Sequence, residues 1–150
     1  MIKVQPDDFD LSIETDLLIG DNTNVGAVVS FVGRVRDREG KGSLASMTLE
    51  HYPGMTEKML AGIEAEAVAR WPLEASLIIH RYGSLKPGDN IVLVITASAH
   101  RQAAFEACDF LMDWLKTKAP FWKLESGDDG DGWVAAKDSD DEAAARWTRK

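Results

Sequence analysis

The stretch ASLIIHRYGSLKPGDNIVLVITA, residues 75–97, decides the fold of this chain. Two runs rich in apolar residues, 75–82 and 91–97, lie on either side of the sequence KPGD. Proline followed by glycine is typical of a tight turn, so we predict that the two runs pair as an antiparallel hairpin. The elements before and after this hairpin then determine the fold class.

Two helices and three strands are predicted before the hairpin. The strands are expected at 2–5, 26–37 and 44–51, and the helices at 9–19 and 55–70. The strand at 26–37 begins with apolar residues on both faces, so we expect it to be central and buried. The second helix carries one apolar stripe of Met59, Ile63 and Ala67.

A long helix is predicted directly after the hairpin, at 99–118, and Pro120 ends it. Its apolar stripe is expected to consist of Phe105, Cys108, Met112 and Leu115. Short strands follow at 121–125 and 132–135. The tail begins a last helix, in which Ser139 and Glu142 have the spacing of a capping box. The pattern as a whole predicts an α+β fold with mostly antiparallel strands.

Length and composition predict one globular domain spanning residues 1–150. The single cysteine excludes an intrachain disulfide and a metal site built from cysteines. The first residues lack the apolar run of a signal peptide, and no stretch approaches the ~20 apolar residues of a membrane span. We therefore expect a cytoplasmic protein that binds no membrane.

The formal net charge of -8 is unevenly distributed along the chain. Eight acidic residues and one lysine lie between Glu125 and Glu142, and the rest of the chain is close to neutral. An acidic protein lacks the broad basic face that nonspecific nucleic-acid binding needs. A small cationic pocket remains compatible with this composition, because local charges set the local potential.

Three arginines, Arg34, Arg36 and Arg38, follow one another at a period of two near the end of the strand at 26–37. That period places them on one face, which carries Val28, Ser30 and Val32 earlier in the strand. A strand that leaves the core into a charged loop explains this pattern. A clamp for phosphate or carboxylate explains it as well, because guanidinium groups bind these anions through two parallel hydrogen bonds.

The sequence SAHR, residues 98–101, lies between a strand and the long helix. Backbone amides at the beginning of a helix attract anions, and His100 and Arg101 add hydrogen-bond donors there. His100 alone is better explained as an ordinary residue at a helix start.

Three lysines surround two large aromatic residues in KTKAPFWK, residues 116–123. Lys116 and Lys118 fall in the last helical turn, where the helix dipole favours positive charge. That explanation does not extend to Lys123, which follows the proline on a segment that resembles a strand. Neighbouring cations and partial burial can make a lysine usable as a nucleophile or a proton shuttle.

Several long blocks of the sequence resemble one known enzyme family. The blocks are GAVVSFVGRVRD, LEHYPGMTEKML, RYGSLKPGDNIVLV, SAHR, FEACDFLMDWLKTKAPFWK and SDDEAAARW. In order and spacing they are similar to the large, catalytic subunit of molybdopterin synthase, from about residue 24 to residue 147. The first 23 residues are only loosely similar to that family.

The resemblance implies a fold, a reaction and partners. The fold would be an α/β hammerhead with an additional, mostly antiparallel sheet. The enzyme would be a sulfurtransferase of molybdenum cofactor biosynthesis that converts cyclic pyranopterin monophosphate to molybdopterin. The sulfur would arrive as a thiocarboxylate on the C-terminal Gly-Gly of a small ubiquitin-like subunit. Two large subunits would form a central homodimer within a heterotetramer, and the reaction would need no metal or other cofactor.

The resemblance also implies roles for individual residues. The family's catalytic lysines correspond to Lys116 and Lys123, and its substrate-binding residues fall on Arg34, Val35, Arg36, His100 and Arg101. The first basic residue of GRVR is often lysine in the family, which changes the donor geometry at Arg34 but not the charge. Both reactants would be anions, so a cationic pocket would help to bring them together.

Two other functions stay open at this point. A noncatalytic module that binds a partner's C-terminal carboxylate would keep the arginines without needing the two lysines. An enzyme acting on phosphate esters is disfavoured because the sequence shows no metal-ligand motif. The residues at the two ends of the helix at 99–118 also raise a geometric question. About 15 residues, or roughly 22–24 Å, separate Arg101 from Lys116, so we expect a site shared between two chains.

Overall fold

The computed structural model describes residues 1–37, 44–119, 121–127, 132–134 and 138–148. Its elements, in chain order, are β1 (Ile2–Gln5), α1 (Leu11–Ile19), β2 (Ala27–Arg34), β3 (Leu44–His51), α2 (Met55–Arg70), β4 (Leu73–Arg81), β5 (Gly83–Leu85), β6 (Asn90–Ser98), α3 (Arg101–Lys118), β7 (Phe121–Gly127), β8 (Gly132–Val134), α4 (Asp138–Ala145) and the short 3-10 helix η1 (Arg146–Thr148). Helices and mostly antiparallel strands confirm the predicted α+β class.

The larger sheet has the strand order β1-β4-β6-β2 and is built around the predicted hairpin. β4 and β6 pair antiparallel, β2 pairs antiparallel with β6, and β1 pairs parallel with β4. The connection between β4 and β6 contains β5 and a tight turn, in which the amide of Asp89 donates to the carbonyl of Lys86 over 2.9 Å. Gly88 has a φ of 94° in this turn, a conformation that favours glycine.

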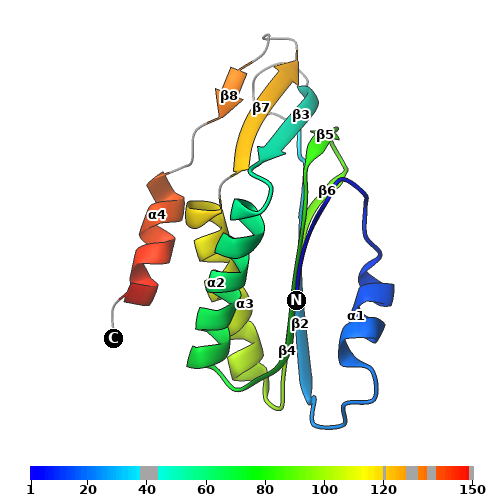
Figure 1. Ribbon diagram of the computed structural model, residues 1–150, viewed down its shortest axis with the longest axis vertical. Helices are drawn as coiled ribbons and strands as arrows, with labels where there is room; N and C mark the ends of the chain where they lie inside the picture. Colours follow the sequence, from blue (N-terminus) through cyan, green and yellow to red (C-terminus); the bar gives the residue numbers. More distant parts are fainter. Residues whose placement is uncertain (38–43, 120, 128–131, 135–137, 149–150) are drawn as a thin grey trace.

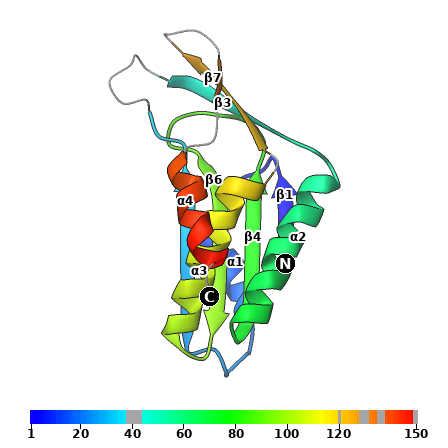
Figure 2. The same cartoon turned by 90° about the vertical axis from the view of Figure 1, so that its left-hand side faces the viewer.

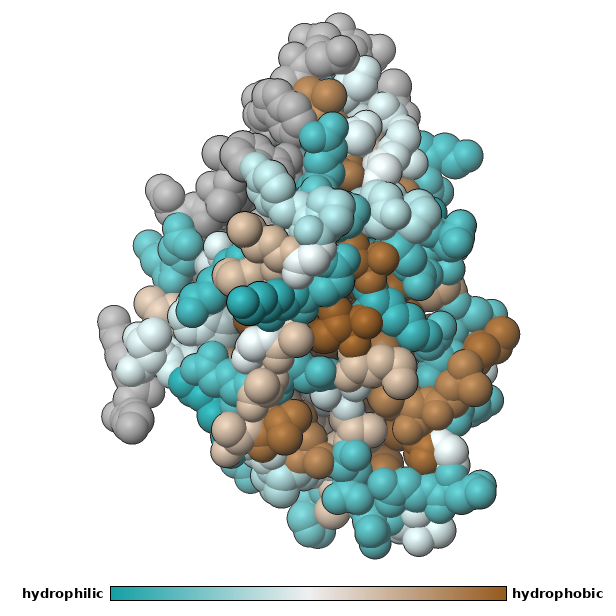
Figure 3. Space-filling model, in the orientation of Figure 1, coloured by the Kyte–Doolittle hydropathy of each residue, from teal (hydrophilic) through white to brown (hydrophobic). Residues whose placement is uncertain are grey.

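Helices cover both faces of the larger sheet (Figure 1). On one face, α2 and α3 enclose the main core, in which Leu60, Phe110 and Ile78 are fully buried. On the other face, α1 lies over a smaller cluster through Leu18, together with Phe9 just before the helix. Figure 3 shows apolar side chains gathered over α1, so this helix leaves much of its apolar surface in solvent.

The smaller sheet lies at one end of the larger one and has the order β5-β3-β7-β8. All of its pairs are antiparallel, and its own small cluster contains Val35, Met47, Leu49 and Leu85. β7 follows the C-terminal end of α3 along the chain, so that end of the helix lies where the two sheets meet. Residues from α3 and from both sheets therefore converge in this region.

The C-terminal elements pack against α3 (Figure 2). One carboxylate oxygen of Asp113 accepts hydrogen bonds from Arg146 Nη2 over 2.8 Å and from Trp147 Nε1 over 2.6 Å. The Trp147 ring lies edge-on against Trp71 and Phe110, with centroids 5.6 Å apart in both pairs. These contacts hold η1 against the helix that carries Lys116. The proposed capping box at Ser139 lies outside the described side chains.

The prediction that the strand at 26–37 is central is wrong, because β2 is an edge strand of the larger sheet. Val28 is 42% exposed and Phe31 is 40% exposed. Apolar residues on both faces are typical of a central strand, but here they lie at a sheet edge and two of them remain exposed. The strand also ends earlier than predicted, at Arg34, where its register with β6 shifts.

Two predicted helix stripes also need correction. On α2 the buried residue is Leu60, whereas Met59 is 38% exposed. On α3, Cys108, Met112 and Leu115 are buried as predicted, but Phe105 is 60% exposed. Each of the two residues continues the helical spacing of its stripe, but its side chain remains partly exposed.

Candidate active site

The C-terminal end of α3 carries two lysines that differ in their surroundings. The helix ends at Ala119, whose extended backbone, with ψ of 126°, is expected before a proline. Lys118 places its ammonium 4.3 Å from the centroid of the Trp114 ring, a cation–π contact. Lys116 lies exposed in the same last turn. Both lysines are exposed, and the ring contact gives Lys118 a packing role in addition.

Lys123 reaches the same region from the smaller sheet. It lies on β7, where it is half-buried and pairs with Leu49 of β3 and Val134 of β8. Its charge and that of Lys116 both act on the imidazole of His80 in β4. The two lysines therefore come from different elements, and the charge of each lowers the pKa of the same buried side chain.

Sequence reasoning did not single out His80. Its side chain is only 6% exposed, and the ring stacks on Phe121 with centroids 3.6 Å apart and planes 16° from parallel. Burial lowers the pKa of His80 to about 3, opposed by its hydrogen bond to the Arg81 carbonyl and assisted by the charges of Lys123 and Lys116. The imidazole is therefore uncharged at neutral pH.

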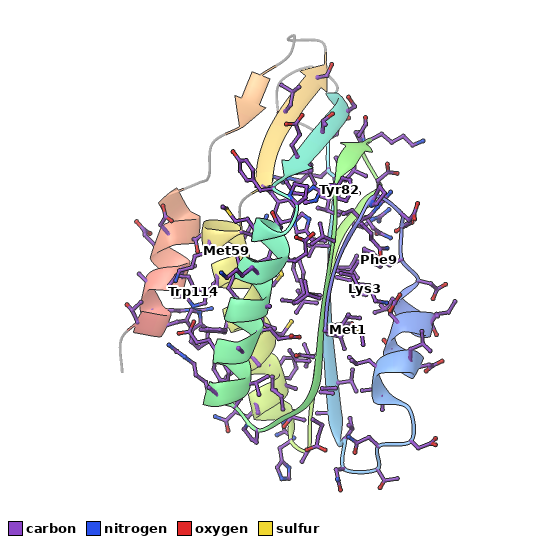
Figure 4. The ribbon with its side chains drawn as sticks, in the orientation of Figure 1. Met1, Lys3, Phe9, Met59, Tyr82 and Trp114 are labelled. Carbon is purple, nitrogen blue, oxygen red and sulfur yellow. The ribbon has the colours of Figure 1, made fainter. Side chains whose placement is uncertain are left out.

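A second histidine extends this aromatic group. The His51 ring, at the end of β3, lies 4.2 Å from the Tyr82 ring and 6.5 Å from the Phe121 ring, centroid to centroid. Tyr82 lies where the larger sheet meets β3 (Figure 4). Four rings from both sheets thus form one aromatic cluster, His51, His80, Tyr82 and Phe121, next to the lysines.

The three residues of the RVR sequence differ in exposure. Arg34 is exposed, and its Nη2 donates to the Gly88 carbonyl over 2.6 Å. Val35 is 3% exposed. Its amide donates to the Asp89 carbonyl over 2.8 Å, and its carbonyl accepts from the Gly88 amide over 2.7 Å. Arg36 is exposed just beyond the strand. The predicted strand does not continue through the arginines, because β2 ends at Arg34. Arg38 lies outside the described residues, so the prediction that all three arginines share one face stays untested.

These residues lie at the lysine end of the molecule. Val92 of β6 pairs with Gly33 on one side and with His80 on the other. Strands lie about 4.8 Å apart, so the end of β2 and His80 are separated by roughly 10 Å. The structure thus brings Arg34, Val35 and Arg36 to the same end as Lys116 and Lys123.

His100 and Arg101 lie at the opposite end. His100 precedes α3 in extended conformation, and its side chain makes no capping hydrogen bond. Both residues are exposed. They follow the far end of β6, and α3 runs without interruption from Arg101 to Lys118. Within one chain, the predicted site is therefore divided into two groups separated by most of the length of α3.

Within the described part of the chain, the cysteine and the possible metal ligands form no alternative centre. Cys108 is buried in the main core, and burial raises the pKa of its thiol to about 11, so the thiol stays protonated. Among the described residues, no group of His, Cys, Asp or Glu is arranged to hold a metal ion. In the same part of the chain, no helix combines the length and the apolar character needed to cross a membrane.

Comparison with known proteins gives a consistent result. Residues 4–118 match the family described as MoaE protein. The molybdopterin synthase catalytic subunit of Mesorhizobium japonicum is 55% identical over 97% of this chain and 92% of its own length. The protein of the same name from Pseudomonas aeruginosa is 55% identical over 97% of each chain.

Solved structures agree with the sequence relatives. The molybdopterin biosynthesis MoaE protein from Burkholderia ambifaria aligns with a TM-score of 0.86 and 51% identity, covering 100% of this chain and 99% of its own. A complex of subunits 1 and 2 of molybdopterin-converting factor from Helicobacter pylori shares the fold, with a TM-score of 0.72 at 19% identity over 91% of this chain and 90% of its own. The chain belongs to the MoaE protein family, the catalytic subunits of molybdopterin synthase.

Proposed function

We propose that this chain converts cyclic pyranopterin monophosphate to molybdopterin by inserting the two dithiolene sulfurs. The sulfur is supplied as a thiocarboxylate at the C-terminal Gly-Gly of a small ubiquitin-like subunit. One arrangement carries the proposal: Lys116, from the last turn of α3, and Lys123, from the separate strand β7, both lie at the end of the molecule where the two sheets meet. A module that only bound a carboxylate would not need two lysines brought together in this way.

The cationic groups suit the charges of both reactants. The pterin carries a phosphate and the donor carries a thiocarboxylate, so the two anions repel each other as they approach. Arg34 and Arg36 near the lysines supply guanidinium groups that bind such anions through paired hydrogen bonds. Fixed positive charge also stabilises the negative charge that develops during transfer.

The two lysines take different roles in this proposal. Lys116, exposed in the last turn of α3, acts directly on the reacting groups, either as a nucleophile toward the activated tail or as a proton shuttle. Lys123, half-buried on β7, stabilises the developing oxyanion or activates the substrate. Lys118 stays outside the reaction because its ammonium lies over Trp114.

Two copies of the chain complete the site in this proposal. β2 is an edge strand that exposes Val28 and Phe31, and α3, which packs against β2, exposes Phe105. A two-fold axis that pairs β2 antiparallel with a second β2 sets the Arg34 end of one strand beside the Ala27 end of the other. Because Ala27 pairs with Ser98, His100 and Arg101 of the second copy then approach the lysines of the first.

The small subunit is the second partner of this assembly. The Helicobacter pylori structure is a complex of two subunits of molybdopterin-converting factor, which supports pairing between a chain of this fold and another subunit. We propose that the tail of the small subunit enters at the lysine end, so that its thiocarboxylate lies between Lys116 and Lys123. Each end of the homodimer then carries one small subunit, which gives a heterotetramer.

Product formation tests this function. The purified chain is mixed with cyclic pyranopterin monophosphate and the thiocarboxylated small subunit, and molybdopterin is detected by mass spectrometry. Lys116→Ala is expected to abolish product formation while the variant stays folded, and Lys118→Ala, two residues away, is expected to keep it. Binding of the tail without product by the wild-type protein would establish a noncatalytic module instead. Near wild-type turnover by Lys116→Ala would show that the catalytic assignment is wrong.

A further inference from the structure

The His80 side chain is a buried polar group at the candidate site to which the proposed reaction assigns no role. It projects from β4 on the same side as Ile78, toward the layer formed by α2 and α3. Its backbone is held on both sides, by Val4 of β1 and by Val92 of β6. The backbone of His80 is therefore held between two neighbouring strands of the larger sheet, close to the smaller sheet.

The hydrogen bond of His80 determines which nitrogen carries the proton. Nδ1 lies 2.8 Å from the backbone carbonyl oxygen of Arg81. A carbonyl oxygen only accepts, so Nδ1 is the donor and Nε2 carries the lone pair in the neutral ring. This bond holds the imidazole in one tautomer and one orientation.

The stacking contact links the larger sheet to the strand that carries Lys123. His80 belongs to the larger sheet, whereas Phe121 is the first residue of β7 in the smaller sheet. Alternate residues of a strand share a face, so Phe121 and Lys123 point to the same side of β7. A ring stacked on Phe121 at 3.6 Å thus fixes the strand two residues before the lysine.

The charges around His80 explain why this ring has to be uncharged. The charged and titratable groups that oppose its protonation are Lys123 from β7, Lys116 from α3 and His51 from β3. A permanent cation at this position would repel both ammonium groups, and a carboxylate would form an ion pair with one of them. A neutral aromatic ring does neither, so it leaves the positive charge of both lysines unchanged.

We propose that His80 is a positioning residue: its neutral ring seats Phe121 and thereby fixes Lys123 relative to Lys116. The inference rests on the proposed function, because it assigns the lysine pair to sulfur transfer. His80 itself transfers no proton in the reaction. Its contribution is geometric, and a small displacement of a catalytic group is enough to lower a rate by as much as about 100-fold.

Three variants of His80 separate this role from the alternatives. His80→Ala removes the ring, His80→Phe keeps a stacking ring without nitrogen, and His80→Asn keeps a donor for the Arg81 carbonyl without a ring. Ile79→Ala is the matched control, because Ile79 is the adjacent, fully buried residue and faces α1 on the other side of the sheet. For each variant, kcat and KM for the thiocarboxylated small subunit are measured from pH 6 to 9.

The proposal predicts a distinct pattern among these variants. His80→Ala and His80→Asn lower kcat at least about tenfold and change KM by less than about threefold, since the arginines that bind the anions stay in place. His80→Phe and Ile79→Ala keep kcat within about threefold of wild type. The shape of the pH profile is the same in all active proteins. If His80→Ala does not fold, His80→Asn carries the test.

Two results would overturn the proposal. Wild-type kcat in the ringless variants would show that the stack positions nothing. An inactive His80→Phe protein that has also lost one limb of the pH profile would make His80 a proton-transfer group instead.

An NMR measurement that needs no substrate separates this inference from the proposed function. Stacking on His80 shifts the ring-proton NMR signals of Phe121, and the signals of the Lys123 side chain report its position. Both sets of signals are expected to change in His80→Ala and to stay close to wild type in His80→Phe. If the wild-type protein forms no molybdopterin, the proposed function fails, but these signals still decide whether His80 positions Lys123.

Discussion

Burial of His80 makes the stability of the protein depend on pH. Its pKa is lowered to about 3 in the folded protein, mainly by desolvation, while an unfolded histidine titrates near 6.5. The unfolded chain therefore binds the proton more tightly. The stability that comes from the neutral ring is fully present above pH 6.5 and is lost as the pH falls toward 3.

We predict a measurable difference between the wild-type protein and His80→Phe in this range. From pH 6 to pH 4 the wild type should lose up to about 1.4 kcal/mol of unfolding free energy per pH unit more than the variant, because only the wild type gains this proton on unfolding. Urea unfolding at several pH values measures both proteins. The carboxylates titrate in both, so their contribution cancels in the difference. Parallel stability curves would show that His80 does not hold its proton as weakly as its burial indicates.

At the residue scale, the sequence identifies the candidate catalytic lysines more readily than the residues that surround them. Lys123 stands out because it follows a proline and a helix dipole does not explain it, and the resemblance to the family points to the same residue. His80 carries no such signal, because it lies within an apolar strand sequence, LIIHRY, and its neighbours come from residues far along the chain. Its polar side chain in an otherwise apolar run is the one feature that marks it. Only the packing of the two sheets shows what surrounds it.

At the scale of elements, replacement of glycine by alanine is expected to change the stability of the protein in opposite directions at two positions. A Cβ on Gly26, just before β2, would lie 2.2 Å from the backbone oxygen of Ala99, far inside the van der Waals distance. The amide of Gly26 also donates to Ser98 over 3.0 Å, so the segment cannot move away freely. A Cβ on Gly62, inside α2, would meet no atom within 4 Å.

We predict that Gly26→Ala lowers the free energy of unfolding by roughly 2–3 kcal/mol, because backbone atoms have to shift to accept the methyl group. Gly62→Ala is the control, and it should raise the free energy by about 0.5–1 kcal/mol, because alanine loses less conformational entropy in a helix. Urea unfolding of both variants measures the two changes. An unchanged stability in Gly26→Ala would mean that the approach of β2 to residue 99 is looser than the structure indicates.

The helices and strands could be predicted from local sequence signals, but which elements lie next to each other in space could in part not be predicted. β3 and α2 have the predicted bounds, 44–51 and 55–70, because a turn sequence begins the helix and Trp71-Pro72 ends it. The antiparallel pairing of β4 with β6 follows from the turn between them. The position of β2 at the sheet edge has no local signal, because its run of apolar residues is the pattern of a strand that is paired on both sides.

At the scale of the whole molecule, the two groups of basic residues lie at opposite ends. Arg34 pairs with Asn90 at one end of β6, and Ala27 pairs with Ser98 at the other. Nine residues of strand separate these ends by about 27 Å. A substrate of ordinary size cannot contact Lys116 and Arg101 of one chain together. The proposed antiparallel pairing of two β2 edges would remove this conflict, because it would place opposite ends of two chains side by side.

Subunit mixing tests this shared site. Lys116→Ala and Arg101→Ala are each expected to be inactive, because every pocket in either homodimer lacks one essential group. After complete exchange of an equal mixture, half of the dimers contain both variants. One of the two pockets in such a dimer combines wild-type groups from both chains. Activity should therefore return to about a quarter of the wild-type value.

A second mixture provides the matched control. Lys116 and Lys123 belong to the same end of one chain, so Lys116→Ala mixed with Lys123→Ala leaves every pocket defective and should stay inactive. Exchange is verified by native mass spectrometry with one variant isotopically labelled. If the first mixture stays inactive after verified exchange, the pocket is built within one chain, and His100 and Arg101 act elsewhere. If the second mixture regains activity, the two lysines of one pocket come from different chains. Lys116 and Lys123 of the same chain are then not the pair that catalyses the reaction.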